Sequence, residues 1–271
     1  MRILFLGDTV GRTGREAAAS ALPGLRQRLG IELAIINAEN ASHGFGVAPE
    51  MAEALFAAGA DVITLGNHAW DRKEIIPYIA AHNRLIRPFN FPPGTPGAGL
   101  ATVALADGRR AVVANAMGRL FMDPLDCPFR TMAGELAKHR LGASVQAIVV
   151  DFHAEATSEK WAFAHLFDGQ VSLVVGTHTH CPSADHTILA GGTAFQSDAG
   201  MCGDYDSVIG MDKTLAAARF LRKVPGEKLH PADGEATVCG LYVETDDATG
   251  LAKRCEPVRL GGRLSQTLPH V

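Results

Sequence analysis

The sequence lacks the cysteine pattern of a disulfide-stabilised domain. Its few cysteines are widely spaced and include no Cys-x-x-Cys pair. They are Cys127, Cys181, Cys202, Cys239 and Cys255. An odd, scattered set of this kind argues against a disulfide framework and is typical of proteins from a reducing compartment.

Long apolar runs and a basic surplus are also missing. No segment reaches the roughly 18 consecutive apolar residues that a membrane-spanning helix needs. The chain runs from Met1-Arg2 directly into a strand-like segment that ends at Gly7-Asp8, without the long apolar region and cleavage site of a signal peptide. The formal net charge of −4 disfavours a broad grip on nucleic-acid phosphates, although it leaves room for a local basic pocket. We therefore expect a cytoplasmic protein with no membrane partner and no stable DNA binding.

Hydrophobic residues make up 47% of the 271-residue chain, which is enough for a substantial core. In the first part of the chain, short apolar runs that end in turn residues alternate with helix-like segments. The predicted strands are 2–6, 33–38 and 61–65, and the predicted helices are 16–22, after a loop at 11–15, and 49–58. This order of strand, helix and strand indicates an α/β fold.

The rest of the chain continues in the same way. Further helices are predicted at 72–82, interrupted near Pro77, and at 130–140, 158–166 and 212–222. Further strands are predicted at 101–105, 111–116, 146–151 and 171–175, and antiparallel strands at 187–189, 193–197 and 237–245. Asp107-Gly108 is a hairpin signal, and Thr157 or Ser158 is expected to cap the helix that follows. Because no linker or repeat interrupts this pattern, we expect one domain over residues 1–271, with a small excursion at about 200–236.

Polar side chains follow five of the predicted strands at the point where each strand ends. In α/β sheets the ligand site lies beyond the carboxyl ends of the strands, so these side chains should converge. Four of these strands supply Asp8, then Glu39 and Asn40, then Asn67 and His68, then His153, and the fifth supplies His178 and His180 from the run Gly176-Thr177-His178-Thr179-His180. The pattern predicts a metal site.

The chemistry of these side chains indicates which ions they suit. Carboxylate and amide oxygens together with imidazole nitrogens, and no thiolate, suit Mn, Fe or Zn. Even without His68, seven candidate ligands exceed the needs of one such ion, and a carboxylate between two ions can bridge them. Two ions would hold a phosphate and lower the pKa of a bound water. The sequence therefore predicts phosphoester hydrolysis.

Several blocks of the sequence resemble a known family. Gly7-Asp8, Gly66-Asn67-His68, His153 and residues 176–180 resemble the metal-binding blocks of the calcineurin-like metallophosphoesterases. The segments 37–40, 151–157 and 204–211 are similar to the YmdB-like branch of that superfamily, and the resemblance covers nearly the whole chain. It implies a sandwich of two mixed β-sheets flanked by helices (αββα), with the metal site at the carboxyl ends of the strands.

Two departures from the superfamily pattern agree with this branch. Position 10 is Val, where most members carry a histidine ligand, and Glu39 takes the place of the usual bridging aspartate. The resemblance implies two divalent or mixed-valence ions, with Fe ahead of Mn or Zn. It implies one ion held by Asp8, Glu39, Asn40 and His180, and a second held by Glu39, Asn67, His153 and His178. His68 is left over, and the resemblance assigns it the role of general acid, with a structural histidine as the alternative.

The resemblance implies a phosphodiesterase that acts on cyclic nucleotides, the 2′,3′-cyclic form in particular. Opening this strained ring needs an activated water and a proton for the leaving oxygen, which two metals and His68 would provide. Two alternatives remain open. The first is a phosphomonoesterase or nucleotidase on the same site, and the second is a non-enzymatic, metal-dependent regulatory or RNA-associated protein. An enzyme of this size is often a homo-oligomer.

Weaker signals lie near these motifs. Arg12 and Arg15 either hold substrate phosphate or are solvated structural residues, and His43 either faces the cleft or is a loop residue. Cys181, directly after His180, is expected to be a small buried thiol rather than a ligand.

Overall fold

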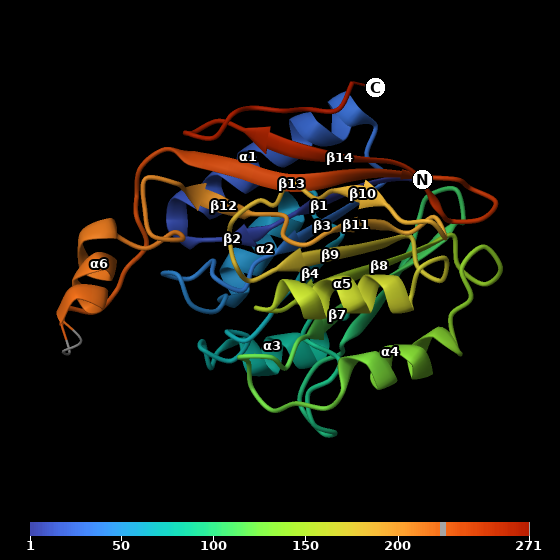
Figure 1. Ribbon diagram of the computed structural model, residues 1–271, viewed down its shortest axis with the longest axis horizontal. Coiled ribbons are helices and arrows are strands. Elements are labelled where there is room, and N and C mark those ends of the chain that lie inside the picture. The colour runs from blue at the N-terminus through green and yellow to red at the C-terminus, as the bar shows by residue number, and fades with distance from the viewer. Residues whose placement is uncertain (223–225, 271) are drawn as a thin grey trace.

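Two β-sheets pack face to face, and helices cover their outer surfaces (Figure 1). The computed structural model describes residues 1–222 and 226–270. The excursion predicted at about 200–236 therefore lies partly outside the described residues. Within the described part of the chain, no helix is both long and apolar enough to cross a membrane.

The first sheet has the strand order β2-β12-β13-β1-β3-β4-β5, with β14 paired to β13. Its strands are β1 (Arg2–Leu6), β2 (Asp8–Thr9), β3 (Leu33–Asn37), β4 (Val62–Thr64), β5 (Leu85–Ile86), β12 (Met201–Asp204), β13 (Ala236–Thr245) and β14 (Ala252–Leu260). The neighbours β1, β3, β4 and β5 are parallel. Their carboxyl ends therefore lie at one end of the sheet.

The second sheet has the order β10-β11-β9-β8-β7-β6. Its strands are β6 (Leu100–Ala104), β7 (Arg110–Met117), β8 (Ala147–His153), β9 (Leu173–Thr177), β10 (Thr187–Ile188) and β11 (Ala194–Gln196). The predicted hairpin is confirmed, since β6 and β7 pair antiparallel, and β7, β8 and β9 are parallel. Prediction of 193–197 as antiparallel was half right, because β11 runs antiparallel to β10 but parallel to β9.

Successive side chains along each strand point to opposite faces of its sheet, and this produces three apolar layers. On β1, Ile3 and Phe5 face the layer between the two sheets, while Leu4 and Leu6 face the helices. On β8, Val149 faces the layer between the sheets, and its neighbours face the helices on the other side. The αββα sandwich implied by the family resemblance is thereby confirmed.

Helices α1 (Gly11–Leu29), α2 (Pro49–Ala57) and α3 (Ile75–Ala81) cover the first sheet, and α4 (Pro128–Leu136) and α5 (Thr157–Leu166) cover the second. The loop predicted at 11–15 is wrong, because α1 begins at Gly11. Gly14 is needed there, since a Cβ on it would lie 2.0 Å from the carbonyl oxygen of Cys202 on β12. The interruption at Pro77 is also wrong, because Pro77 lies in the first turn of α3, where a missing N–H costs nothing.

One smaller expectation also fails, and one strand was missed. Helix α5 begins after Ala156 without a side-chain cap, so neither Thr157 nor Ser158 has the predicted capping role. Strand β14 carries no clear alternation and was not predicted. In the region 200–236, β12 belongs to the first sheet, whereas α6 (Lys213–Arg222) projects away from the sandwich (Figure 1).

Candidate metal centre

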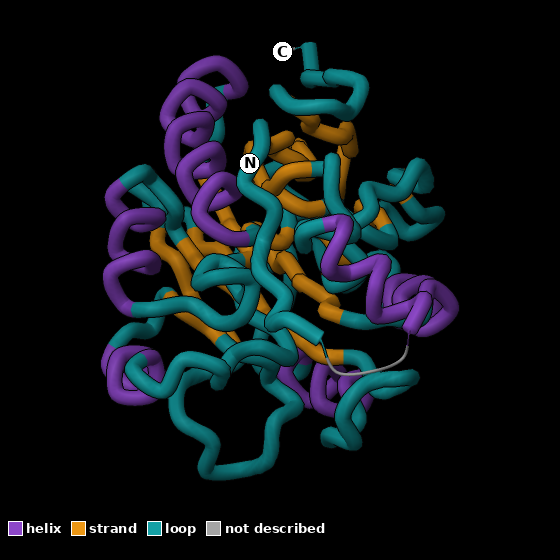
Figure 2. The backbone as a smooth tube through the Cα atoms, turned by 90° about the vertical axis from the view of Figure 1, so that its left-hand side faces the viewer, coloured by secondary structure: helices purple, strands orange, loops and turns teal. Residues whose placement is uncertain are grey.

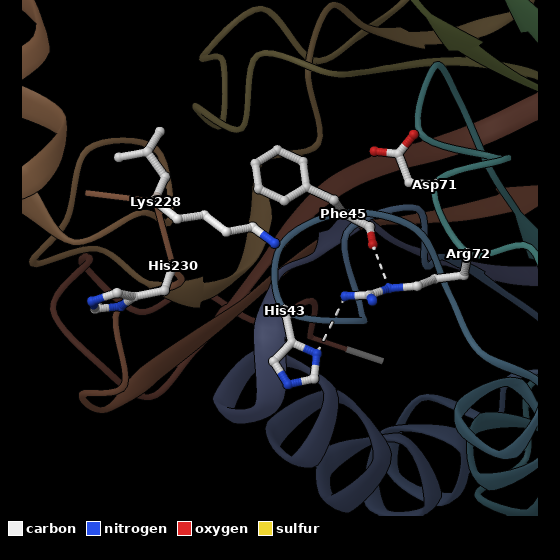
Figure 3. Close-up of a pocket in the computed structure, with 7 residues that line it drawn as sticks. His43, Phe45, Asp71, Arg72, Lys228 and His230 are labelled. Carbon is white, nitrogen blue, oxygen red and sulfur yellow. Dashed lines mark hydrogen bonds between the residues drawn. The ribbon is translucent and has the colours of Figure 1, made fainter. Parts of the chain in front are cut away.

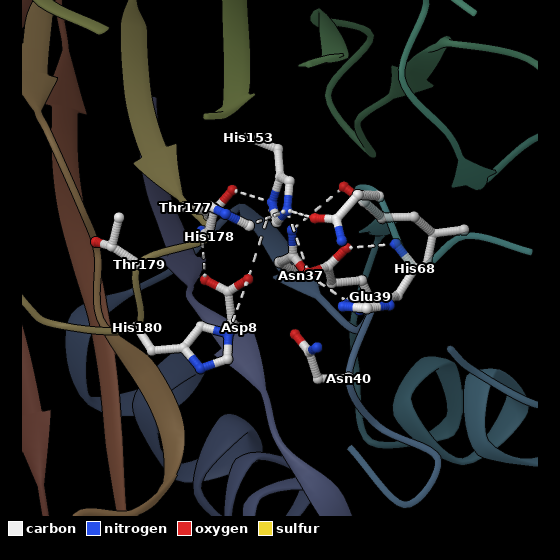
Figure 4. Close-up of polar contacts among 12 residues, drawn as sticks. Asp8, Asn37, Glu39, Asn40, His68, His153, Thr177, His178, Thr179 and His180 are labelled. Carbon is white, nitrogen blue, oxygen red and sulfur yellow. Dashed lines mark hydrogen bonds and ion pairs between the residues drawn. The ribbon is translucent and has the colours of Figure 1, made fainter. Parts of the chain in front are cut away.

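The seven predicted metal ligands lie together at one end of the sandwich, which Figure 2 views end-on. Asp8 follows β1, Glu39 and Asn40 follow β3, and Asn67 follows β4. From the second sheet, His153 ends β8, and His178 and His180 follow β9. The carboxyl ends of parallel strands from both sheets therefore contribute to one site (Figure 4).

The potential ligand atoms form two groups that share one carboxylate. Glu39, His153 and His178 form one group, and Asp8, Glu39 and His180 form the other. Within each group, the ligand atoms lie within 4.8 Å of one another. A carboxylate common to both groups is the arrangement that a bridging ligand requires.

The first group is the more tightly packed. His153 Nε2 lies 3.1 Å from Glu39 Oε1 and 2.9 Å from Asn67 Oδ1. His178 Nδ1 lies 3.1 Å from the same nitrogen of His153. Two imidazole nitrogens and two oxygens therefore face a single small volume, as the ligands of one ion would.

The second group contains acceptor atoms that lack donors. His180 Nε2 lies 3.8 Å from Asp8 Oδ1. Asp8 Oδ1 and Asn40 Oδ1 are both buried, and among the described residues neither has a hydrogen-bond partner. The amide nitrogen of Asn40 donates to the carbonyl of Gly44 at 3.1 Å, which leaves its oxygen for the site. Because buried acceptors without donors are costly, these two oxygens fit a cation.

Each histidine is held by its second ring nitrogen, as is usual for metal ligands. His153 Nδ1 lies 2.9 Å from Thr177 Oγ1, which donates to Asp151 at 2.7 Å. His178 Nε2 contacts Glu155 at 3.1 Å, and His180 Nδ1 donates to the carbonyl of Ile209 at 2.8 Å. Glu155 therefore acts directly on a histidine, and Asp151 acts on another through a threonine.

The turn after β9 is strained and clamped. His178 and His180 have φ values of 95° and 64°, in the left-handed region that costs a non-glycine residue energy. Asp198 accepts from the backbone N–H and the hydroxyl of Thr179, at 3.0 Å and 2.7 Å. Buried Lys160 donates to the carbonyl of Thr177 at 2.8 Å and to Asp198 at 3.2 Å. In the sequence, residues 158–160 had two interpretations, a segment that orders the site or the start of a helix, and the contacts of Lys160 fit the first.

Gly66 lets the backbone come close to the ligands. A Cβ on this residue would lie 2.3 Å from Glu39 Oε2 and 2.4 Å from His153 Nε2. Any side chain here would push these two groups apart.

The buried groups shift one another's pKa values. Burial raises the pKa of Asp8 to about 7, although His180 and His153 oppose the shift. Burial alone would raise the pKa of Glu39 too, but His153 outweighs it and lowers this pKa to about 2. Burial works to lower the pKa of His153, yet Glu39 raises it to about 9. Burial and the nearby His153 lower the pKa of His178 to about 3. Since metal ligands must be deprotonated, protons on Asp8 and His153 compete with metal ions.

His68 lies at the edge of this centre. Its backbone N–H donates to Glu39 Oε2 at 3.1 Å, and its ring Nδ1 lies 2.9 Å from Asp71 Oδ2. The ring of Phe45 meets it edge-on, with the centroids 5.0 Å apart. Asp71 was not predicted, although its position three residues after His68 is the spacing that brings two side chains together in a helical turn.

A cleft opens beside His68. A cavity of about 730 Å³ is lined by His43, Phe45, Asp71, Arg72 and residues 228–230 (Figure 3). His43 therefore faces the cleft, which was the first of the two interpretations of this residue. Cys181 is exposed, so its prediction as a buried thiol is wrong, because the turn after His180 points its side chain outward.

The fold and the site together define a metal-dependent phosphoesterase architecture, and comparison with known proteins identifies the branch. The profile of the YmdB-like protein family matches residues 4–258. The chain belongs to this family. It is 44% identical to the 2′,3′-cyclic-nucleotide 2′-phosphodiesterase of Bacillus subtilis (strain 168), over 95% of this chain and 96% of that protein.

Two crystal structures are also similar to this chain. One is of a hypothetical protein from Thermus thermophilus, with a TM-score of 0.90, 39% identity, and coverage of 97% of this chain and 100% of the other. The second is of a Mycoplasma pneumoniae protein described as a novel phosphatase, with a TM-score of 0.89, 32% identity, and coverage of 96% and 93%. The family carries divalent metal ions, which agrees with the donor groups found here.

Proposed function

We propose that this protein is a two-metal phosphodiesterase that hydrolyses 2′,3′-cyclic nucleotides. The observation that carries the proposal is the pair of donor groups sharing Glu39, with His68 beside them. The activity named for the Bacillus subtilis relative, which matches this chain along almost its full length, supports the same substrate class.

The proposed ligands divide between two ions. Asp8, Glu39, Asn40 and His180 would hold one ion, and Glu39, Asn67, His153 and His178 would hold the other. When bound, such ions supply a Lewis acid for the phosphate and lower the pKa of a water molecule. The mixed oxygen and nitrogen donors suit Fe foremost, and Mn or Zn as well.

The residues of the chain supply the remaining chemistry. Hydrolysis adds water across one ring P–O bond of the cyclic diester, and leaves a phosphomonoester and a ribose hydroxyl. His68 donates the proton that this leaving oxygen needs. Because Asp71 holds Nδ1 at 2.9 Å, Nε2 is the ring nitrogen that can carry the proton. Asp71 thereby fixes the orientation of the acid.

We further propose that the protein acts in the reducing cytoplasm. All five cysteines are free thiols, which supports a compartment where disulfides do not form.

A rate panel on the metal-loaded protein tests the function. We expect hydrolysis of 2′,3′-cyclic AMP and of bis-p-nitrophenyl phosphate, and poor hydrolysis of p-nitrophenyl phosphate. A preference for the monoester would instead establish the phosphomonoesterase alternative. Full metal occupancy without turnover of any ester would leave only the non-enzymatic alternative, a metal-dependent regulatory or RNA-associated protein.

A further inference from the structure

A second compartment adjoins the cleft beside His68. The first, of about 730 Å³, and the second, of about 290 Å³, share His43 and His230 in their linings. Together they form a path that leads from His68 past the amino-terminal end of α1. Two adjoining compartments make room for more than one nucleoside.

The position of His68 decides which part of the substrate enters this path. Its proton goes to the ribose oxygen that leaves phosphorus, so the ribose lies on the side of His68. Phe45 and Asp71, which contact His68, also line the first compartment. The base and any nucleotides on the 5′ side of the ribose therefore extend into the cleft.

Cations line both compartments. Arg72 and Lys228 line the first, and in Figure 3 the ammonium group of Lys228 reaches toward Phe45 and His43. Arg72 donates to the carbonyls of Ser42 and Phe45, at 3.0 Å and 3.3 Å. These partners are uncharged, so they fix the guanidinium without neutralising it.

Arg12 and Arg15 line the second compartment. The contact of Arg12 with Glu16 at 3.4 Å is exposed, which makes it weak and readily exchanged. The acids in the two linings are Asp71, which already binds His68, and Asp233. The path is therefore basic, although the whole chain carries a formal charge of −4.

A cyclic mononucleotide has no negative charge that could pair with these cations. Its single negative charge is the cyclic phosphate, which lies at the metal centre, and the rest of the nucleoside is neutral. An RNA strand that ends in a 2′,3′-cyclic phosphate carries one additional charge for each nucleotide on its 5′ side. Cations along the path of that strand would pair with these phosphates.

We propose that the cleft is a subsite for the 5′-side phosphodiesters of RNA, and that the enzyme acts on oligoribonucleotides ending in a 2′,3′-cyclic phosphate. This inference rests on the proposed function and narrows its substrate class.

The test compares kcat/KM of the metal-loaded protein for 2′,3′-cyclic AMP and for an adenosine trinucleotide with a 2′,3′-cyclic end. We expect the trinucleotide value to be higher by about tenfold or more, the effect of one charge-assisted hydrogen bond. The trinucleotide value should also fall more steeply with salt, by a logarithmic slope of about −0.7 for each phosphate contacted. In Lys228→Gln and Arg12→Gln, the preference for the trinucleotide and the extra slope both decrease.

Lys138→Gln is the matched control, because Lys138 is 65% exposed and lies outside both linings. Fluorescence polarisation with a 3′-phosphorylated trinucleotide gives a readout without turnover, and the two cleft variants should bind it more weakly than the control does. Equal kcat/KM values and equal salt slopes for the two substrates would overturn the subsite while leaving the proposed function intact. Turnover of neither substrate would overturn both.

Discussion

The buried pair of Lys160 and Asp198 should stabilise both the fold and the metal site. Their side chains are 1% and 4% exposed, and their charged atoms lie 3.2 Å apart. In Lys160→Met, Asp198 stays buried without its cation, and breaking a buried pair in this way costs about 3–5 kcal/mol.

The remaining hydrogen bonds of Asp198 place the loss of stability near the lower limit of this range. Asp198 would keep three hydrogen bonds, from the N–H and hydroxyl of Thr179 and from the N–H of Gly200 at 2.8 Å. We therefore expect a loss of about 3 kcal/mol from a total stability of about 5–15 kcal/mol. Loss of the contact to the Thr177 carbonyl should also let the strained turn relax, since each left-handed histidine costs about 1–3 kcal/mol.

Two measurements check this prediction. Urea unfolding of the metal-free protein gives the change in the free energy of unfolding, and elemental analysis after reloading gives the metal content, which should fall. Lys138→Met at an exposed position is the control, with an expected change within about 0.5 kcal/mol. A change below about 1 kcal/mol for Lys160→Met, with full metal content, would refute the reasoning.

Three further predictions concern the centre itself. His68→Ala should keep its metals but lose about 10²–10⁴-fold in kcat on 2′,3′-cyclic AMP. The loss on bis-p-nitrophenyl phosphate should be much smaller, because its leaving group needs no proton. Equal losses on both substrates would argue against a general acid. Gly66→Ala should lower the metal content, because its Cβ would lie within 2.4 Å of Glu39 and His153, whereas Gly134→Ala, with open space around it, should not. The metal-free protein should become less stable between about pH 6 and pH 9 in thermal melts. Asp8 and His153 have pKa values raised above those of the unfolded chain, so the stability they contribute is lost as the pH rises through about 7 and about 9; a melting temperature that rises over this range would contradict the assigned shifts.

The sequence predicted those parts of the fold that depend on local pattern. The buried strands around residues 2–6, 33–38 and 146–151 are confirmed, because short apolar runs that end in turn residues have few other conformations. The αββα arrangement came from the family resemblance, since periodicity alone does not show that two sheets pack against each other.

The errors arose where tertiary packing outweighs local signals. The glycines at the start of α1 suggested a loop, but close packing on β12 requires Gly14 to be small. Strand β14 was missed because it is an edge strand whose side chains are mostly half-buried, without a clear alternation.

In the candidate site, too, the local pattern was predictable and the tertiary contacts were not. Its proposed ligands were identified in the sequence because each follows a strand. The sequence pointed to some of the residues that support them but not to their contacts, because a contact such as that of Lys160 with the Thr177 carbonyl depends on how α5 packs on the second sheet. Likewise, the basic cleft joins Arg12, Arg72 and Lys228 from distant parts of the chain, whose overall charge is negative.

The most direct test of the account is the metal content of three variants compared with the unaltered protein. If Glu39 is shared between two ions, the unaltered protein binds two metal ions per chain and Glu39→Ala loses both. His180→Ala and His153→Ala should each retain about one, because their side chains belong to different donor groups. A single ion in the unaltered protein, or the same content in Glu39→Ala as in His180→Ala, would contradict the shared carboxylate.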